Sequence, residues 1–292
     1  MPDYCIFPSL LDKFQQLIDY EQETEQPWNI VSENAHKNGK HLDKEVGDYI
    51  LSPDEMYEKI EAELIDTINR CDGVPIEAAD KGTCFNEIID CLIENRKSSR
   101  PDIDIKSEKV EDNKTAIIAT LNGFTFAFDA DFCKSVAKEF KGAITQYMCK
   151  SSIVTKYGDV EIYGYIDEYM PNRIVDIKTT SMYNFGRFEN KWQRHAYPYC
   201  VVNSGVSTDI DEFEYYVVVW DKSSSLLKGS IHKEVYPYRH KYSTERLRAM
   251  IEHFLYWLHR RKQFITNNRI FGGVNPEGYV GTPIDINLLK TA

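Results

Sequence analysis

The chain has 292 residues, of which 42% are hydrophobic and 28% are charged, so it can bury a sizeable core and is not intrinsically disordered. Its net charge of −11 argues against a protein that coats nucleic acid through a general basic surface. No apolar run approaches the roughly 20 residues needed to cross a membrane, and no charged and then apolar leader opens the chain, so we expect a cytoplasmic protein without membrane contact.

Two amphipathic helices are expected near the N-terminus. Apolar spacing predicts one over Leu10–Tyr20 and another from Ser52 or Pro53 to Arg70, with the charged segment Glu21–Gly47 as a loop between them. The charged, proline-containing stretch Ser98–Lys114 is expected to be a linker.

A third helix is expected over residues 81–94. Its apolar side chains recur at helical spacing and form one stripe, made of Phe85, Ile88, Ile89 and Leu92. Glu87 lies next to the edge of this stripe, whereas Asp90 and Glu94 lie on the far side. Glu87 is therefore the acidic residue expected to reach a neighbouring sheet.

The second half of the chain is expected to combine strands with helices. The Asn122-Gly123 pair predicts a hairpin turn, and a short helix follows at about 130–140. Strands are expected at about 143–157, 160–169, 173–178, 215–220 and 229–236. A last helix is expected to begin at Ser243, and the cations His259–Lys262 at its end either contact DNA or only complement the helix dipole.

The strands joined by Met170-Pro171-Asn172-Arg173 are expected to form an antiparallel hairpin. Because proline cannot take the positive φ of a primed two-residue turn, a four-residue loop is expected. Either loop places Asp167 opposite Asp176. Two carboxylates facing each other on a sheet repel, and a divalent cation between them removes that repulsion.

Side-chain alternation places Lys178 on the same face as Asp176 and turns Val175 and Ile177 toward a core. A hard cation such as Mg²⁺ takes oxygen ligands and keeps waters that a phosphate can replace; Asp167, Asp176 and the backbone carbonyl of Ile177 fit that role. A lysine beside the cation can hold or deprotonate the attacking water and offset charge in the transition state. The hairpin therefore predicts metal-dependent phosphodiester hydrolysis.

The order of these motifs resembles the PD-(D/E)xK nuclease superfamily, in the branch of RecB-like and λ-exonuclease-like domains. That branch reads G-x-x-D, then (D/E)-x-K, then Q-x-x-x-Y, and this chain has Gly164 to Asp167, Asp176 to Lys178 and Gln193 to Tyr197 in that order. The likeness covers about residues 82–220. D-x-K alone is common by chance, so the specificity of the match lies in the order of its elements.

The resemblance implies an acidic residue on the helix before the hairpin, and Glu87 is expected to fill that role. The expected catalytic set is thus Lys178, Asp176, Asp167 and Glu87, with Glu87, Asp167, Asp176 and the Ile177 carbonyl as metal ligands. Related nucleases often carry a histidine where this helix has Asn86, so a histidine-assisted preference for Mn²⁺ has no support here. Substrate contacts are expected from Gln193, Tyr197, Thr179, Arg187, Lys191 and Arg194.

Simpler structural interpretations remain open for these residues. Asp167, Asp176 and Lys178 can be solvated groups on an exposed hairpin, with an ion pair worth well under ~1 kcal/mol. Gln193 and Tyr197, one helical turn apart, can be a satisfied core pair. Glu87 can be an ordinary surface residue of its helix.

Two cofactors are not expected. The seven cysteines include no C-x-x-C pair, and none follows Cys200, so reduced thiols are expected and the C-terminal cysteine triplet that holds an iron–sulfur cluster in some RecB-like nucleases is missing. No G-x-x-x-x-G-K-[ST] phosphate loop is present, so the sequence does not encode ATP use by this motif.

The expected fold is α/β, with a restriction-endonuclease-like core in which helices flank a mixed central β-sheet. A single domain is expected, with an N-terminal helical addition over 1–75, a catalytic core over 76–240, and a C-terminal helix and tail over 241–292. The expected function is that of a Mg²⁺-dependent deoxyribonuclease, in which Mn²⁺ can substitute.

The resemblance implies an exonuclease of recombination, repair or phage DNA processing. The alternatives are a structure-selective or restriction-like endonuclease, and a catalytically silent nucleic-acid-binding or protein-binding module on the same fold. DNA is the expected partner. The resemblance also allows a single-strand annealing or recombination protein as a partner, and it allows oligomers.

Overall fold

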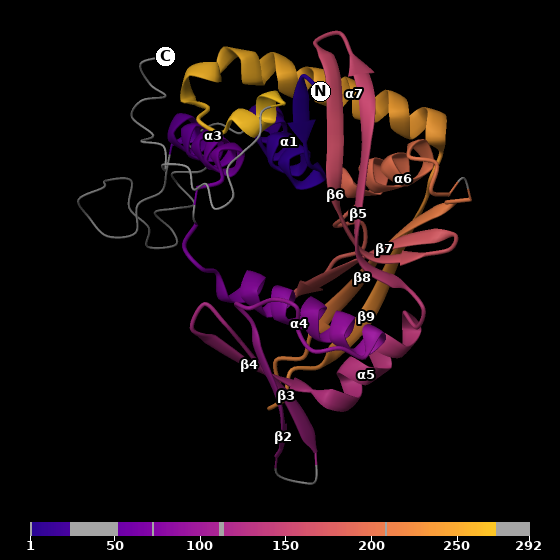
Figure 1. Cartoon of the computed structure of the whole chain (residues 1–292). Helices are drawn as coiled ribbons and strands as arrows, with labels where there is room; N and C mark the ends of the chain where they lie inside the picture. The colour runs from indigo at the N-terminus through magenta and orange to yellow at the C-terminus, as the bar shows by residue number, and fades with distance from the viewer. Residues whose placement is uncertain (1, 24–51, 72, 111–113, 208, 273–292) are drawn as a thin grey trace, which may run out of the picture. The chain divides into compact units, whose positions relative to one another are not determined.

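A computed structural model describes residues 2–23, 52–71, 73–110, 114–207 and 209–272 (Figure 1). The loop expected over Glu21–Gly47 lies outside the described residues from residue 24 onward. The chain divides into two compact units. One consists of residues 73–153 and 162–247 and carries the predicted motifs; the other combines residues 1–72, 154–161 and 248–292.

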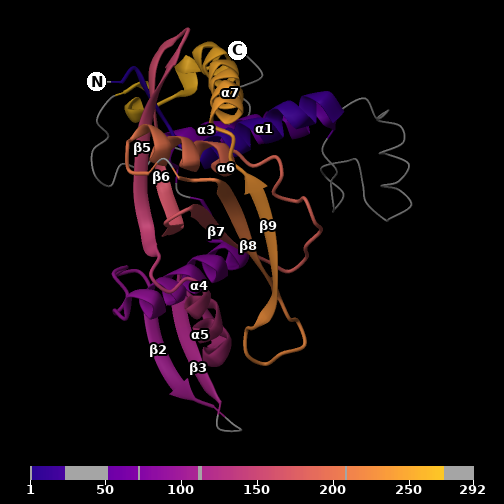
Figure 2. The ribbon, with the colours of Figure 1, turned by 90° about the vertical axis from the view of Figure 1, so that its right-hand side faces the viewer.

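The motif-bearing unit is built on a mixed β-sheet (Figure 2). Its strands follow the order β6 (Gly158–Met170), β7 (Arg173–Thr180), β8 (Glu212–Trp220) and β9 (Gly229–Pro237), and β5 (Ile144–Thr155) also pairs with β6. β6 and β9 run antiparallel to their neighbours β7 and β8. β7 and β8 are parallel, as expected for strands joined through a crossover helix, here α6 (Gln193–Asn203).

Helices cover both faces of this sheet. On one face, α4 (Glu77–Glu94) and α5 (Ala130–Glu139) share a buried core with Val175 and Ile177 of β7 and with Tyr216 and Val218 of β8. On the other face, Cys200 of α6 contacts the carbonyl of Ile162 in β6. The expectation of a mixed sheet flanked by helices is confirmed.

A second, three-stranded antiparallel sheet packs against α4 and α5. It consists of β2 (Asp104–Lys109), β3 (Thr115–Leu121) and β4 (Phe124–Asp129). The predicted hairpin turn at Asn122-Gly123 is confirmed, with φ of 51° and 84° at the two residues.

The expectation of a linker over Ser98–Lys114 is wrong for residues 104–109, because β2 pairs along its whole length with β3. β2 is an edge strand with mostly exposed, charged side chains, so no apolar alternation revealed it.

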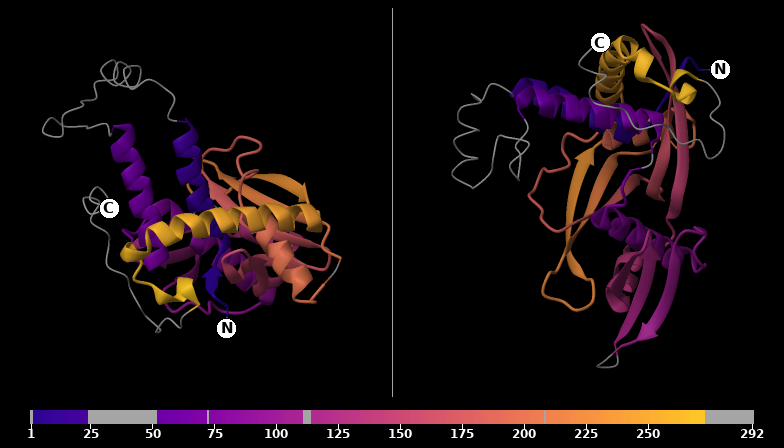
Figure 3. Two further views of the ribbon diagram at one scale, coloured as in Figure 1. Left: turned by 90° about the horizontal axis from the view of Figure 1, so that it is seen from above. Right: turned by 90° about the vertical axis from the view of Figure 1, so that its left-hand side faces the viewer.

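The other unit is mostly helical. It contains α1 (Pro8–Glu23) and α3 (Pro53–Asn69), which lie side by side (Figure 3, left). Ser52 and Glu55 form a capping box at the start of α3. β1 (Tyr4–Ile6) runs beside the first residues of β6, where the Asp3 amide donates to the Asp159 carbonyl.

α7 (His240–Arg260) begins three residues before the expected Ser243, and its residues 248–260 belong to this helical unit. Its apolar stripe, made of Leu247, Met250, Ile251, Phe254 and Leu258, is buried. The short 3₁₀ turns η2 (Lys262–Phe264) and η3 (Asn268–Phe271) follow.

Among the cations at the end of α7, Arg261 donates to the buried carboxylate of Glu61 at 2.9 Å. That contact gives Arg261 a structural role. None of the helices in the described ranges has the length and apolar character to span a membrane.

Candidate functional site

The loop of the β6–β7 hairpin is shorter than expected. Met170 pairs with Arg173, so only Pro171 and Asn172 connect the strands, and neither has a positive φ. The expected four-residue loop is wrong, because the turn closes in two residues without a primed geometry. The register is unaffected, since Glu168 pairs with Val175.

Beyond the pair Glu168–Val175, the backbones of β6 and β7 no longer pair. The Asp167 side chain bonds β7 there instead. Asp167 Oδ2 accepts a hydrogen bond from the Ile177 amide at 2.8 Å, so a carboxylate replaces the β6 backbone as partner of β7. In an extended strand the N–H and C=O of one residue point toward the same neighbour. The Ile177 carbonyl is therefore directed toward the side of Asp167, as expected for a backbone metal ligand.

Asp176 is buried and held by two side chains. Lys178 Nζ lies 2.5 Å from Asp176 Oδ2, which confirms that the two residues share a face. On the opposite oxygen, Oδ1 accepts from Gln193 Nε2 at 2.8 Å. Gln193 is thus turned to a carboxylate of the site, and it also hydrogen-bonds Tyr197.

Burial makes both aspartates costly to ionise. Burial raises the pKa of Asp167, and the neighbouring Asp176 carboxylate raises it further. Burial also raises the pKa of Asp176, while Lys178 opposes that shift. The pair is therefore electrostatically strained without an additional cation.

A cavity of about 680 Å³ opens between α4, β5 and β6 within the motif-bearing unit. Asp167 lines it from β6. One face of α4 supplies a row of polar side chains at helical spacing, namely Thr83, Asn86, Glu87, Asp90 and Glu94. β5 supplies Thr145 and Gln146, and the segment after α4 supplies Arg96, Ser99 and Arg100.

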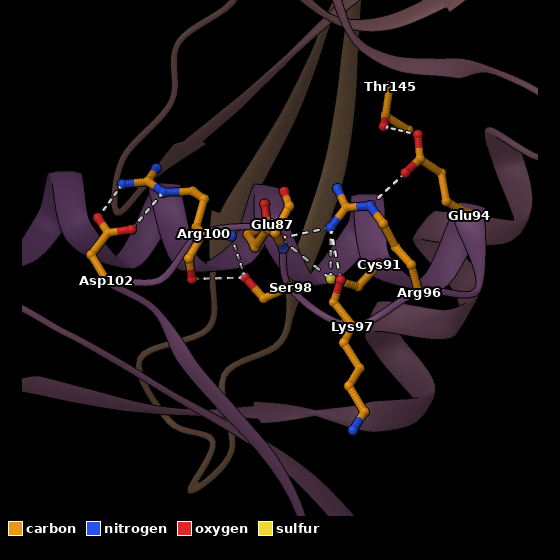
Figure 4. A network of polar contacts seen from close by, with 10 residues as sticks. Glu87, Cys91, Glu94, Arg96, Lys97, Ser98, Arg100, Asp102 and Thr145 are labelled. Atoms are coloured by element: carbon orange, nitrogen blue, oxygen red, sulfur yellow. Dashed lines mark hydrogen bonds and ion pairs between the residues drawn. The ribbon is translucent and has the colours of Figure 1, made fainter. Parts of the chain in front are cut away.

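Glu87 is committed to the segment that follows its own helix (Figure 4). Its Oε1 accepts from Arg96 Nη1 at 2.8 Å and from the Ser99 amide at 3.1 Å. Burial alone raises the pKa of Glu87, but the hydrogen bonds, above all that from Arg96, lower it overall. Arg96 also pairs with Glu94. The carboxylate expected to bind metal is thus already neutralised by an arginine.

Asp90 is in the opposite situation. It is 2% exposed, and its Oδ1 has no hydrogen-bond partner. Burial first, then Asp167 and Glu87, raise the pKa of Asp90 to about 8. Asn86, one turn earlier on the same face, also has a buried amide oxygen without a partner. Asp90 and Asn86 are therefore better placed than Glu87 to receive a cation.

Glu168 is a buried acid that the sequence reasoning missed. It is fully buried, and both of its carboxyl oxygens lack a partner. Burial, followed by Asp90 and Asp167, raises its pKa to about 9, so this carboxyl is protonated at neutral pH. Its position opposite the core residue Val175 was the available signal, because paired residues share a face.

Three or more His, Cys, Asp or Glu side chains do not come together in a metal-holding arrangement anywhere in the described ranges. The reason is visible in the contacts, since Glu87 is turned to Arg96, and Asp176 to Lys178 and Gln193. The remaining donors are the oxygens of Asp90, Asp167, Asn86 and the Ile177 backbone, together with Asp176 Oδ2, which among the described residues accepts no hydrogen bond and pairs only with Lys178. An all-oxygen set fits a hard cation such as Mg²⁺.

Two of the expected substrate contacts lie against the protein itself. Thr179 faces α4, where a Cβ added to Gly82 would lie 2.8 Å from the Thr179 hydroxyl. Arg194 stacks over the ring of Tyr236 at 4.5 Å.

The two expected cations in the segment between β7 and α6 differ in their contacts. Arg187 donates to the Thr180 hydroxyl at 3.0 Å and to the Met182 carbonyl at 2.6 Å. Lys191 is half-buried and forms no ion pair with any residue in the described ranges.

Comparisons with known proteins give little further information. No family model and no curated protein matches the chain. Its structure is similar to a solved one described as "Crystal structure of SSO0001", with 15% sequence identity and a TM-score of 0.30. The match covers 41% of this chain, which spans about half, 54%, of that protein. A likeness this low carries no conclusion about function.

Proposed function

We propose that this protein is a Mg²⁺-dependent deoxyribonuclease with a PD-(D/E)xK site. The observation that carries the proposal is the split end of the β6–β7 hairpin. There Asp167 and Asp176 meet across the two strands, and Lys178 lies 2.5 Å from Asp176. A charge pattern of two acids and one lysine, with a cavity on the Asp167 side, suits the hydrolysis of a phosphodiester.

The cation would be held by Asp167, Asp176 and the Ile177 carbonyl, with Asp90 and Asn86 on the α4 side of the cavity. When bound, it would neutralise phosphate charge and lower the pKa of a water molecule. Glu87 has the supporting role of fixing Arg96 and the segment that closes the cavity. Mn²⁺, which also accepts oxygen ligands, is expected to substitute.

Lys178 is the group that would act on the attacking water. Its Nζ reaches the edge of the acidic pair while its side chain is still 28% exposed. From that position it can orient the water, take its proton, or offset charge on the transition state. Gln193 holds Asp176 from the opposite side and so fixes the orientation of the carboxylate.

DNA is the proposed substrate, and an exonuclease in recombination, repair or phage DNA processing is the proposed activity. The exonuclease preference comes from the order of the G-x-x-D, D-x-K and Q-x-x-x-Y motifs. With a net charge of −11, DNA binding must rely on local cations and on the bound metal, so we expect it to weaken steeply with salt.

The test is digestion of end-labelled linear DNA and closed-circular DNA, single- and double-stranded, in Mg²⁺ and in EDTA. The Asp176→Ala variant serves as the matched inactive protein. Mg²⁺-dependent loss of linear DNA with intact circles is the expected result. Cleavage of the circles would instead indicate an endonuclease. Equal activity of wild type and Asp176→Ala, or no cleavage of any substrate, would refute the proposed nuclease.

A further inference from the structure

Gln146 has a backbone conformation that is unusual for its position. Among the described residues, four that are not glycine have a positive φ. Arg70 and Asn95 end helices, and Asn122 lies in a hairpin turn, where such values are common. Gln146, with φ of 46°, lies inside strand β5. No turn or helix end accounts for it, and such strain gathers at functional positions.

The side chain of Gln146 lies between two acids of the cavity. It lines that cavity with Asp90 and Asp167, and it hydrogen-bonds both carboxyl groups. A carboxamide nitrogen carries two N–H donors, so one side chain can serve two carboxylates. The preceding residue, Thr145, donates to Glu94 of α4, so two successive residues tie the start of β5 to the acids of the site.

We propose that Gln146 is a positioning residue of the Mg²⁺ site, whose carboxamide holds Asp90 and Asp167 toward a common cation. The left-handed backbone is what directs the amide into the cavity, because an extended residue would project its side chain differently. The amide reduces the repulsion between the acids without adding a charge that competes with the cation. This inference rests on the proposed metal-dependent function and specifies one residue of its site.

The test compares Mg²⁺ affinity with stability in the full chain. Glycine adopts a positive φ without strain, and this gain offsets the lost hydrogen bonds to the two acids, so Gln146→Gly should melt in EDTA within a few degrees of wild type. Its Mg²⁺ dissociation constant, measured by calorimetry, should rise about 10- to 100-fold, the usual loss when a partner of a metal ligand is removed. If Gln146 had only a structural role, its replacement would change Mg²⁺ affinity only together with the melting temperature.

Asn122→Gly is the matched control. Asn122 also has a positive φ, of 51°, and its side chain also hydrogen-bonds a carboxylate, that of Asp80, but it does not line the cavity. It should bind Mg²⁺ like wild type. Gln146→Asn is the second variant, because asparagine tolerates this backbone while its shorter side chain cannot reach both acids. It too should bind Mg²⁺ more weakly.

Each outcome decides the matter. If Gln146→Gly and Gln146→Asn bind Mg²⁺ as tightly as wild type, Gln146 has no positioning role, although the proposed function stands. If they lose affinity only in parallel with a large fall in melting temperature, the residue is structural and the inference is wrong. If wild type itself binds no Mg²⁺, the proposed function fails, and the inference fails with it.

Discussion

At the scale of single residues, Glu87 and Asp90 lie three residues apart on α4 but differ in their partners. Both face the cavity of α4, and both are acidic and buried. Glu87 has an arginine and a backbone amide as partners, whereas Asp90 has an oxygen with no partner. A buried ion pair is costly to break, while a buried acid with an unpartnered oxygen is costly to keep charged.

Exchange of each acid for its amide should therefore give opposite results. Glu87→Gln should lower the free energy of unfolding by about 1–3 kcal/mol, because Arg96 loses its charged partner, and should leave Mg²⁺ affinity nearly unchanged. Asp90→Asn should leave stability unchanged or higher and weaken Mg²⁺ binding. Urea unfolding and calorimetry measure the two quantities. The reverse pattern would restore Glu87 as the metal ligand.

Variants of Asp176 and Lys178 should differ in their effects on Mg²⁺ binding and on the rate of cleavage. Asp176→Ala should lose Mg²⁺ binding and cleavage together, with the fold intact or slightly more stable, because burial disfavours the Asp176 charge. Lys178→Ala should still bind Mg²⁺ but lose about 10²- to 10⁴-fold in single-turnover rate. A lysine variant with normal rates at saturating Mg²⁺ would show that this residue does not take part in the chemistry.

His195 should make the protein sensitive to acid. Its Nδ1 lies 3.0 Å from the Ser243 hydroxyl, and burial, then Arg194 and Arg246, lower its pKa from 6.5 to about 3. Below pH 6.5, His195 binds a proton in the unfolded chain but stays neutral in the folded chain. Stability from this residue is therefore full above pH 6.5 and is lost as the pH falls toward 3.

His195→Gln removes this proton linkage. Between pH 7 and pH 5 the variant should lose about 2 kcal/mol less stability than wild type, since each pH unit below the unfolded pKa is worth about 1.4 kcal/mol. Urea unfolding at both pH values measures the difference. Equal losses in the two proteins would mean that His195 is charged in the folded state.

At the scale of elements, the packing of α6 on β6 links two of the predicted motifs. A Cβ at Gly164 would lie 2.7 Å from a ring carbon of Tyr197, so the glycine of G-x-x-D admits the tyrosine of Q-x-x-x-Y. Tyr197 is buried and contacts Gln193, which holds Asp176. The helix thereby holds the Asp176 carboxylate through Gln193.

A double-mutant cycle tests this link. Gly164→Ala should lower the free energy of unfolding by about 1–3 kcal/mol through overpacking. In combination with Tyr197→Leu, which vacates the ring position, the loss should be smaller than the sum of the two single losses. Strict additivity in urea unfolding would show that the two residues do not contact each other in solution.

At the scale of the whole molecule, the cysteines are dispersed through the fold and are not paired in disulfides. All seven lie in the described ranges and none forms a disulfide there; Cys71 and Cys91 are half-buried and the other five are buried. They act as small apolar groups of the core. No covalent link therefore contributes to the stability of either unit.

Thiol titration should reflect this distribution. All seven cysteines should react in denaturant without prior reduction, and in the native protein at most Cys71 and Cys91 should react promptly. The melting temperature should be the same with and without dithiothreitol. Fewer than seven reactive thiols in denaturant, with a melting temperature lowered by reductant, would reveal a disulfide.

The sequence by itself determined the elements whose cause is local. Helical spacing predicted α4 and α7, the Asn-Gly pair predicted the β3–β4 turn, and alternation predicted that Asp176 and Lys178 share a face opposite Val175 and Ile177. These features depend on neighbours along the chain, so one sequence is enough to read them. The sequence did not predict edge strand β2, because its residues do not alternate between apolar and polar.

Only the tertiary structure decided which charges are paired. Arg96 reaches Glu87 because α4 ends at a left-handed Asn95, and Thr145 reaches Glu94 across 51 residues of sequence. Helical periodicity favoured Glu87 over Asp90 as the metal ligand. Periodicity contains no information about Arg96, which lies beyond the helix, or about the Gln146 amide, which comes from β5. Which side chains pair depends on distances in the folded chain. A buried acid is therefore neutralised or left without a partner according to the residues that the fold places beside it.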